Sequence, residues 1–216
     1  TENFWYKVFQ NVLFATVRGV IADNANDDDD MVLDLTAQNG DDAKISSTSI
    51  IQAIFLMGDK FQEITAISMH SVPYSRLVQL NLIDFTPDSE QNVGFGTYLG
   101  KTVILDDDQT STVETIGGTL TPVYWTTLYK RGAFAYGESD QRYVMTEIDR
   151  DPDKGGGIDF LHSRRVFALH PAGFDWQEDT VAKKFPTNTE LATATNWDRA
   201  FSSVKNVGFV VLKTLG

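Results

Sequence analysis

The chain has 216 residues, of which 42% are hydrophobic and 22% are charged, values typical of a globular protein and not of a disordered one. Its formal net charge of −12 disfavours binding to nucleic acid or to anionic membranes. The absence of cysteine excludes disulfides, thiolate metal sites and cysteine nucleophiles. The densest basic pairs, Arg164-Arg165 and Lys183-Lys184, are too small to form a nucleic-acid-binding patch.

Membrane and targeting segments are not expected. No apolar run approaches the roughly 20 residues that a membrane-spanning helix needs, and the N-terminal segment lacks the features of a signal peptide. The chain begins at Thr1, without methionine and directly within a helical pattern. We therefore expect that the N-terminus has been cut.

The first segment is the clearest helix. Apolar residues recur at three- and four-residue steps from Trp5 to Val20, which predicts an amphipathic helix of about twenty residues, roughly 30 Å long. The helix is expected to end near Asp23-Asn24, before the aspartate run Asp27 to Asp30. Clustered carboxylates suit calcium, but this run lacks the alternate spacing, central glycine and terminal glutamate of an EF-hand loop. A solvated acidic loop is the preferred interpretation.

Strands and helices alternate over the next 75 or so residues. Strands are expected at Met31–Leu35, Ile64–Met69 and Lys101–Leu105. The continuous apolar run in the third predicts cover on both faces. One helix is expected with a capping box at Ser49 and Gln52, and a second with Ser71 as its cap and Pro73 in its first turn.

The hydrophobic period becomes two from Val123 onward, which is typical of strands. Strands are expected at 123–129, 133–136, 164–170 and 207–212, with helical potential over 187–196. Before them, a Thr- and Gly-rich connector is expected between the acidic cluster Asp106 to Asp108 and Thr121. The glycine-rich segment Asp149 to Gly157 is expected to be a flexible tip.

The three histidines are the first candidates for catalytic residues. His70 is the strongest candidate because it lies at the end of a predicted strand, where active-site residues of α/β sheets often occur. A general base also needs an orienting partner and a substrate pocket, and no motif supplies either, so a structural histidine is preferred. His162 and His170 stand alone.

Two glycine clusters are candidates for phosphate-binding loops. Gly94, Gly96 and Gly100 lack the Lys-Ser/Thr pair and the strand-to-helix context of such a loop, and Gly155 to Gly157 opens no helix. We therefore predict that the chain is not an enzyme and has no catalytic residues, no cofactor-binding residues, no metal ligands and no cofactor.

Several segments together carry a family resemblance. The stretch ITAISMHSVPYSRLVQLNLIDFTPDSE, followed by TYLGKTVILDD, resembles the major capsid proteins of tailed bacteriophages, which have the HK97-type fold. YWTTLYKRGAFAYGE, EIDRD and SRRVFALHPAG resemble later segments of that family. The matches cover roughly residues 1 to 176 in the family's order, and the part after Gln177 matches less well.

The resemblance implies an α+β, HK97-like capsid fold with two lobes. Residues 1–30 would form the spine helix of a peripheral lobe, and residues 31–137 an axial lobe with a mixed sheet and flanking helices. Residues 138–216 would supply antiparallel return strands of the peripheral lobe and the C-terminal segment. Members of the family usually carry an N-terminal arm and an extended loop before the spine helix, and this chain begins at the helix.

The implied function is that of a structural subunit of an icosahedral bacteriophage head. Copies would assemble into hexamers and pentamers that enclose double-stranded DNA without binding it specifically, with scaffolding, portal or decoration proteins as further partners and no membrane. The expected location is the virion, after assembly in the cytoplasm of the host bacterium. Two alternatives stay open: an encapsulin-like compartment shell, and a small α/β metal-dependent hydrolase using His70 and the cluster Asp106 to Asp108.

Overall fold

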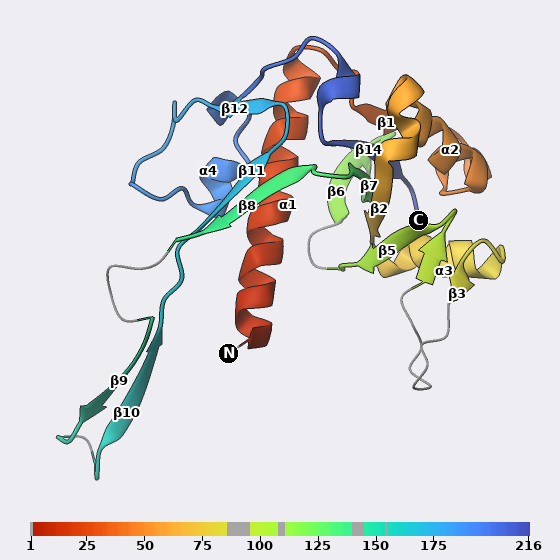
Figure 1. Cartoon of the computed structure of the whole chain (residues 1–216). Helices are drawn as coiled ribbons and strands as arrows, with labels where there is room; N and C mark the ends of the chain where they lie inside the picture. The colour runs from red at the N-terminus through yellow and green to blue at the C-terminus, as the bar shows by residue number, and fades with distance from the viewer. Residues whose placement is uncertain (1, 86–95, 108–110, 140–144, 154) are drawn as a thin grey trace. The chain divides into compact units, whose positions relative to one another are not determined.

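The computed structural model describes residues 2–85, 96–107, 111–139, 145–153 and 155–216 (Figure 1). These residues form two compact units, one of Thr1–Ala133 with Pro171–Gly216 and one of Phe134–His170. A mixed sheet is combined with few helices, which confirms the predicted α+β class. Among the described helices, none combines the length and apolar character that crossing a bilayer requires.

Helix α1 (Glu2–Asn26) confirms the predicted N-terminal helix and extends slightly beyond its predicted end. Its second half carries fully buried side chains, among them Val17 and Val20, whereas Phe4 and Tyr6 in its first turns are exposed. The carbonyl of Asn24 accepts hydrogen bonds from two backbone N–H groups of the following loop. The helix therefore ends in a tight turn, and the loop of residues 27–31 leads from it to the first strand.

The larger unit is built on one mixed sheet. In spatial order its strands are β1 (Val32–Asp34), β14 (Phe209–Thr214), β7 (Thr119–Lys130), β2 (Ile64–Met69), β5 (Lys101–Leu105), β4 (Gly96–Tyr98) and β3 (Asp84–Phe85). The β1–β14 and β2–β5 pairs are parallel and the others antiparallel. The expected strands therefore share one sheet, and the C-terminal strand β14 lies between β1 and β7.

Strand β5 is covered less than its sequence predicts. Val103 is buried, but Ile104 on the opposite face is 43% exposed. The prediction of cover on both faces is therefore wrong: the apolar run TVIL has one buried face within this chain.

Two short helices, α2 (Ser47–Phe55) and α3 (Ser71–Gln79), accompany the sheet, with 3-10 turns η1 (Gly40–Ala43) and η2 (Gly58–Glu63). The capping box of α2 is formed by Ser46 and Ser49: the Ser46 hydroxyl accepts from the Ser49 N–H at 3.2 Å, and the Ser49 hydroxyl accepts from the Ser46 N–H at 2.8 Å. The predicted box at Ser49 and Gln52 is wrong by one helical turn, because both pairs have the same spacing.

The predicted connector before Thr121 is instead mostly a hairpin. Strand β6 (Ser111–Ile116) pairs with the first half of β7 in antiparallel register. The two residues between them, Gly117 and Gly118, have φ of 58° and 84°. Both angles suit the tight turn that joins two strands with the natural twist of a hairpin, which glycine adopts without steric cost.

The smaller unit consists of two strand pairs. Strand β8 (Phe134–Glu138) pairs with β11 (Phe167–Pro171), and β9 (Thr146–Asp151) pairs with β10 (Ile158–Ser163). The predicted flexible tip from Asp149 to Gly157 is wrong in its first part, because residues 149–151 belong to β9.

The remaining segment packs beside α1 in the larger unit. Strands β12 (Phe174–Trp176) and β13 (Trp197–Arg199) pair antiparallel, and helix α4 (Asn188–Leu191) with the 3-10 turns η3 (Ala194–Asn196) and η4 (Val204–Asn206) completes it. The helical potential predicted over 187–196 is thus confirmed as one short helix and one turn. Helix α4 and strand β13 both contact α1.

Candidate functional site

His70 caps a helix. It stands between β2 and α3, and its Nδ1 accepts a hydrogen bond from the backbone N–H of Val72 at 3.1 Å. His70, and not the predicted Ser71, is therefore the N-cap residue of α3. The ring also meets Tyr124 edge-on, with centroids 4.9 Å apart.

Asp107 supports the same helix start. Its Oδ1 accepts a hydrogen bond from the backbone N–H of Ser71 at 2.7 Å and lies 3.5 Å from His70 Nδ1. The Ser71 N–H stabilises the charged carboxylate and so lowers the pKa of Asp107. The structure thus brings together His70 and one aspartate of the predicted acidic cluster, and both atoms serve the first turn of α3. Asp108 lies outside the described residues.

A cavity of about 460 Å³ lies between the first turns of α1 and the end of β5. Tyr6, Lys7 and Gln10 line it from the helix, and Leu105 to Asp107 line it from the strand end. His70 is not among the described lining residues. The cavity therefore does not place a substrate against the strongest catalytic candidate.

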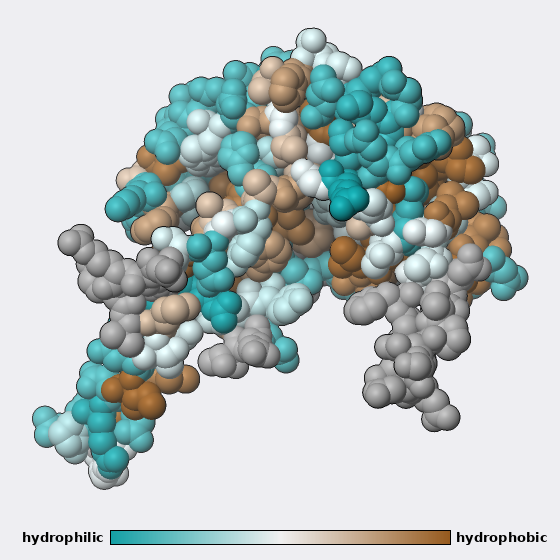
Figure 2. Space-filling view, in the orientation of Figure 1, coloured by the Kyte–Doolittle hydropathy of each residue, from teal (hydrophilic) through white to brown (hydrophobic). Residues whose placement is uncertain are grey.

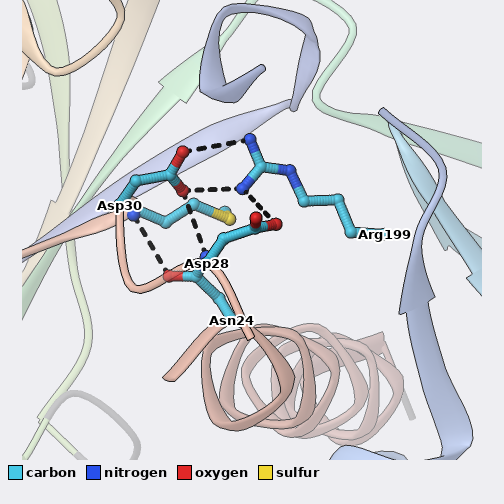
Figure 3. Close-up of polar contacts among 5 residues, drawn as sticks. Asn24, Asp28, Asp30 and Arg199 are labelled. Carbon is cyan, nitrogen blue, oxygen red and sulfur yellow. Dashed lines mark hydrogen bonds and ion pairs between the residues drawn. The ribbon is translucent and has the colours of Figure 1, made fainter. Parts of the chain in front are cut away.

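The aspartates after α1 bind an arginine (Figure 3). Arg199 Nη1 lies 2.6 Å from Asp30 Oδ1 and 2.9 Å from Asp28 Oδ2, and Nη2 lies 3.2 Å from Asp30 Oδ2. The Arg199 side chain is only 5% exposed. In the part of the chain that the structure describes, no three histidine or carboxylate side chains are placed to hold a metal ion.

Asn24 fixes the loop that presents these aspartates. Its amide Nδ2 donates to Asp30 Oδ1 at 3.1 Å, and its Oδ1 accepts from the backbone N–H of Met31 at 3.1 Å (Figure 3). Sequence reasoning missed this network, because Arg199 lies far along the chain in no motif. The run of four aspartates is the only feature of the sequence that points to a charged contact at this loop.

Gly19 allows α1 to approach α4 and β13 closely. A Cβ at this position would lie 2.1 Å from the carbonyl oxygen of Leu191 and 2.6 Å from Trp197 Nε1. That carbonyl accepts a hydrogen bond from Trp197 Nε1 at 2.8 Å, and the Trp197 ring packs edge-on against Trp176. The close contact of α1 with α4 and β13 therefore requires glycine, which has no side chain, at position 19.

The β9–β10 hairpin exposes apolar side chains on both of its faces. Ile148 and Leu161 are direct cross-strand partners and are 73% and 57% exposed. Because successive residues point to opposite faces, Phe160 and Ile158 are on the other face, where both are also exposed. In the view of Figure 2, brown hydrophobic side chains form a patch on the β9–β10 hairpin, which is otherwise largely hydrophilic.

The remaining histidines and basic pairs are on strands or loops. His162 stacks on Phe160 in β10, and His170 is exposed in β11. Arg164 pairs with Glu147 at 2.9 Å and Arg165 with Glu138 at 4.0 Å. Lys183-Lys184 lies exposed in the loop before α4. Carboxylates thus offset the charge of the arginine pair.

The two glycine clusters serve the backbone. Gly94 lies outside the described residues. Gly96 packs against the hydroxyl of Tyr74, and Gly100 forms the two-residue turn between β4 and β5 with a φ of 72°. Gly155 to Gly157, in the turn between β9 and β10, all have positive φ. The described glycines of both clusters lie in turns or close contacts of strands, and none of them opens a helix.

Together these features define a mixed α+β protein with an uncovered apolar hairpin, a type of surface that commonly marks contact with other chains. The chain belongs to the major capsid protein 13-like family, whose model matches residues 3–211. It is also similar to the major capsid protein of Bacillus phage SPP1, with 34% identity over 202 residues. That match covers 94% of this chain and 59% of the relative, so the chain spans little more than half of the relative's length.

These comparisons confirm the resemblance to bacteriophage major capsid proteins. The family is one of structural proteins of the virion and not of enzymes, in agreement with the sequence prediction. Neither the encapsulin-like shell nor the small hydrolase is favoured by them.

Proposed function

We propose that this chain is a structural subunit of an icosahedral bacteriophage head, which assembles with its own copies into hexamers and pentamers around packaged double-stranded DNA. Its place is the capsid of the virion, after assembly in the cytoplasm of the host bacterium. Membership of the major capsid protein 13-like family supports the proposal, as does the similarity to a protein named as a major capsid protein. Scaffolding, portal and decoration proteins are candidate further partners.

Within this proposal the fold is of the HK97 type. Residues 1–30 form the spine helix of a peripheral lobe, residues 31–137 an axial lobe, and residues 138–216 the return strands and C-terminal segment. The length of α1, the mixed sheet accompanied by α2 and α3, and the antiparallel pairs β8–β11 and β9–β10 support it. We place β14 in the sheet of the axial lobe, because it pairs with β1 and β7.

The β9–β10 hairpin carries the argument for assembly. A two-stranded hairpin is marginally stable alone in water, and this one leaves Ile148 and Leu161 exposed on one face and Phe160 on the other. Each fully buried side chain of this size contributes about 1.5–3 kcal/mol, so cover by neighbouring copies stabilises both the hairpin and the assembly. Because exposed apolar residues lie on both faces of the hairpin, their burial requires surfaces of neighbouring copies on both sides.

The net charge of −12 fits a container for DNA. A shell that repels the phosphate backbone lets the duplex slide during filling and leave afterwards, because no tight contacts have to be broken. Filter binding to duplex DNA at two salt concentrations tests this part. Tight, strongly salt-dependent binding would show that the subunit holds DNA directly.

Electron microscopy and analytical ultracentrifugation of the full-length protein expressed alone test the proposed function. Shells, hexamers or pentamers are expected, and a full-length protein that stays monomeric would overturn the proposal. In the variant Ile148→Ser/Leu161→Ser we expect loss of assembly with unchanged circular dichroism, because only the hairpin face changes. Thr146→Ser, on the same face of the hairpin, is the matched control and should assemble normally. Normal assembly of the double variant would remove the hairpin from the interface.

A further inference from the structure

One face of the β9–β10 hairpin combines carboxylates with exposed apolar side chains. Because successive residues of a strand point to opposite faces, Glu147, Asp149 and Asp151 of β9 share this face. Phe160 is the direct cross-strand partner of Asp149, and Ile158 is that of Asp151. Ile158 and Phe160 are 44% and 41% exposed. These five residues define an acidic face that is apolar and negatively charged at once.

The other face of the hairpin carries no such excess of charge. There Arg150 and Asp159 are cross-strand partners, and their side chains form an ion pair of 3.8 Å. On the acidic face, Arg164 offsets the charge of Glu147. Asp149 forms no ion pair with any residue that the structure describes. A partner that covers the acidic face must therefore supply cations together with apolar surface.

The loop before α4 offers this combination. Residues 182–186 are all exposed, and Phe185 among them is 63% exposed. Lys184 Nζ lies 5.9 Å from the centroid of the Phe185 ring. Within the described ranges neither Lys183 nor Lys184 forms an ion pair. Residues 183–185 thus form a basic tip, with two lysines and one aromatic ring directed to solvent.

Hydrogen bonds hold both ends of the basic tip in place. The fully buried Asn196 accepts from the backbone N–H of Thr180 at 2.8 Å. The carboxylate of Glu190 accepts from the backbone N–H of Ala182 at 2.9 Å and from that of Thr187 at 2.7 Å. A loop whose ends are already fixed loses little conformational entropy when it binds. The basic tip is therefore preorganised for a contact.

We propose that the basic tip of one copy docks on the acidic face of the β9–β10 hairpin of a neighbouring copy. Phe185 packs against Phe160 there, and the two lysines lie beside Asp149. This inference rests on the proposed function, which supplies the neighbouring copies. Complementary charge favours this occupant, because oppositely charged surfaces steer association and fix its register. Duplex DNA is a weaker fit to the basic tip, because two lysines neutralise few phosphates on a chain with a net charge of −12.

Disulfide crosslinking of the full-length protein tests the contact. This sequence contains no cysteine, so Phe160→Cys and Phe185→Cys each introduce a single thiol into it. The two variants, one of them tagged, are mixed under assembly conditions and oxidised. A mixed dimer is expected on a non-reducing gel, since the bond forms only where the two Cβ atoms come within about 4 Å. Phe185→Cys mixed with Leu120→Cys, at a position that is 72% exposed on the β6–β7 hairpin, is the matched control and should give no dimer.

Electron microscopy of the same mixtures separates two kinds of failure. Shells that form without the dimer of Phe160→Cys and Phe185→Cys would overturn this contact and leave the proposed function standing. Absence of both the shells and the dimer would overturn both proposals.

Charge reversal tests the complementarity. Asp149→Lys and Lys183→Glu/Lys184→Glu each bring like charges together, so each alone should lower the association constant at least about tenfold, with unchanged circular dichroism. An equal mixture of the two variants offers opposite charges again and should assemble normally in analytical ultracentrifugation. A mixture that stays dissociated would show that the two surfaces do not meet. Salt-dependent DNA binding that is abolished by Lys183→Glu/Lys184→Glu would assign the basic tip to nucleic acid and overturn the proposal.

Discussion

Arg199 and Asp30 form a two-point ion pair across 169 positions of the sequence, with Nη1–Oδ1 and Nη2–Oδ2 distances of 2.6 and 3.2 Å. The pair joins β13 to the residue that immediately precedes the buried Met31. A guanidinium that is 5% exposed has little access to water, so its charge depends on these carboxylates. The ion pair therefore holds the loop after α1 against β13.

Removal of Arg199 should destabilise the larger unit markedly. Arg199→Met leaves Asp28 and Asp30 beside further aspartates without their cation, and we expect a loss of about 2–4 kcal/mol in the free energy of unfolding. Urea unfolding at neutral pH measures it. Lys205→Ala, which breaks the exposed pair with Asp59, is the control and should cost less than about 0.5 kcal/mol. Equal effects of the two substitutions would contradict this reading.

Gly19→Ala should destabilise the protein although alanine favours helices. The added Cβ meets the Leu191 carbonyl at 2.1 Å and would displace Trp197 from its hydrogen bond. We expect a loss of about 2–4 kcal/mol, against a gain of up to about 1 kcal/mol in an exposed helix. Thermal unfolding with tryptophan fluorescence reports both stability and packing. Gly137→Ala, at a strand position with open space, is the control and should be nearly neutral; a stabilised Gly19→Ala would refute the close contact.

His70→Ala should remove the N-cap of α3 and so lower the stability of the protein. Loss of an N-cap acceptor typically costs about 1 kcal/mol, whereas asparagine is among the best caps. His70→Asn should therefore recover most of the stability lost in His70→Ala, as measured by chemical unfolding. His162→Ala, at an exposed position of the hairpin, should leave stability unchanged. A deficit in His70→Asn as large as in His70→Ala would show that the ring's contact with Tyr124 matters more than the cap.

Asp107 should contribute to unfolding in acid. Its pKa is lowered because the Ser71 N–H binds the charged form, so its contribution is present above the ordinary value and is lost as pH falls through the lowered one. The wild type should thus lose more stability between about pH 5 and pH 3 than Asp107→Asn. The difference between the two melting temperatures, measured at both pH values, tests this. Parallel acid profiles would mean that the bond to Ser71 does not form in solution.

Elements with strong periodicity were predictable from the sequence. In helix α1 and the core strands β2 and β7 the apolar residues recur locally with a helical or strand period, although burial is more continuous than that pattern: β2 buries 67–69 and β7 buries 126–129 in succession. The cap of α2 was misplaced because Ser46–Ser49 and Ser49–Gln52 offer the same spacing. Strand β6 was missed because its polar, half-exposed residues carry little alternation.

The features that matter most for function depend on contacts between distant residues. Nothing in the residues around Arg199 indicates that it binds Asp30. Nothing in the residues around Ile148 indicates that it is exposed beside its cross-strand partner Leu161. Burial, together with the charges of neighbouring aspartates, raises the pKa of Asp23 to about 6. Such sites are fixed by the tertiary structure, and a local pattern cannot reveal them.

The position of β14 determines when the sheet can be completed during synthesis. Val211 of β14 pairs with Val32 of β1 on one side and with Thr127 of β7 on the other. The place between β1 and β7 therefore stays empty until β14 has left the ribosome. Strand pairing between residues so far apart in the sequence has a large cost in loop-closure entropy and is therefore slow. Until then β1 and β7 present unpaired backbone edges, which favour pairing with other chains. Release of this one strand therefore decides whether β1 and β7 pair within the chain or with other chains.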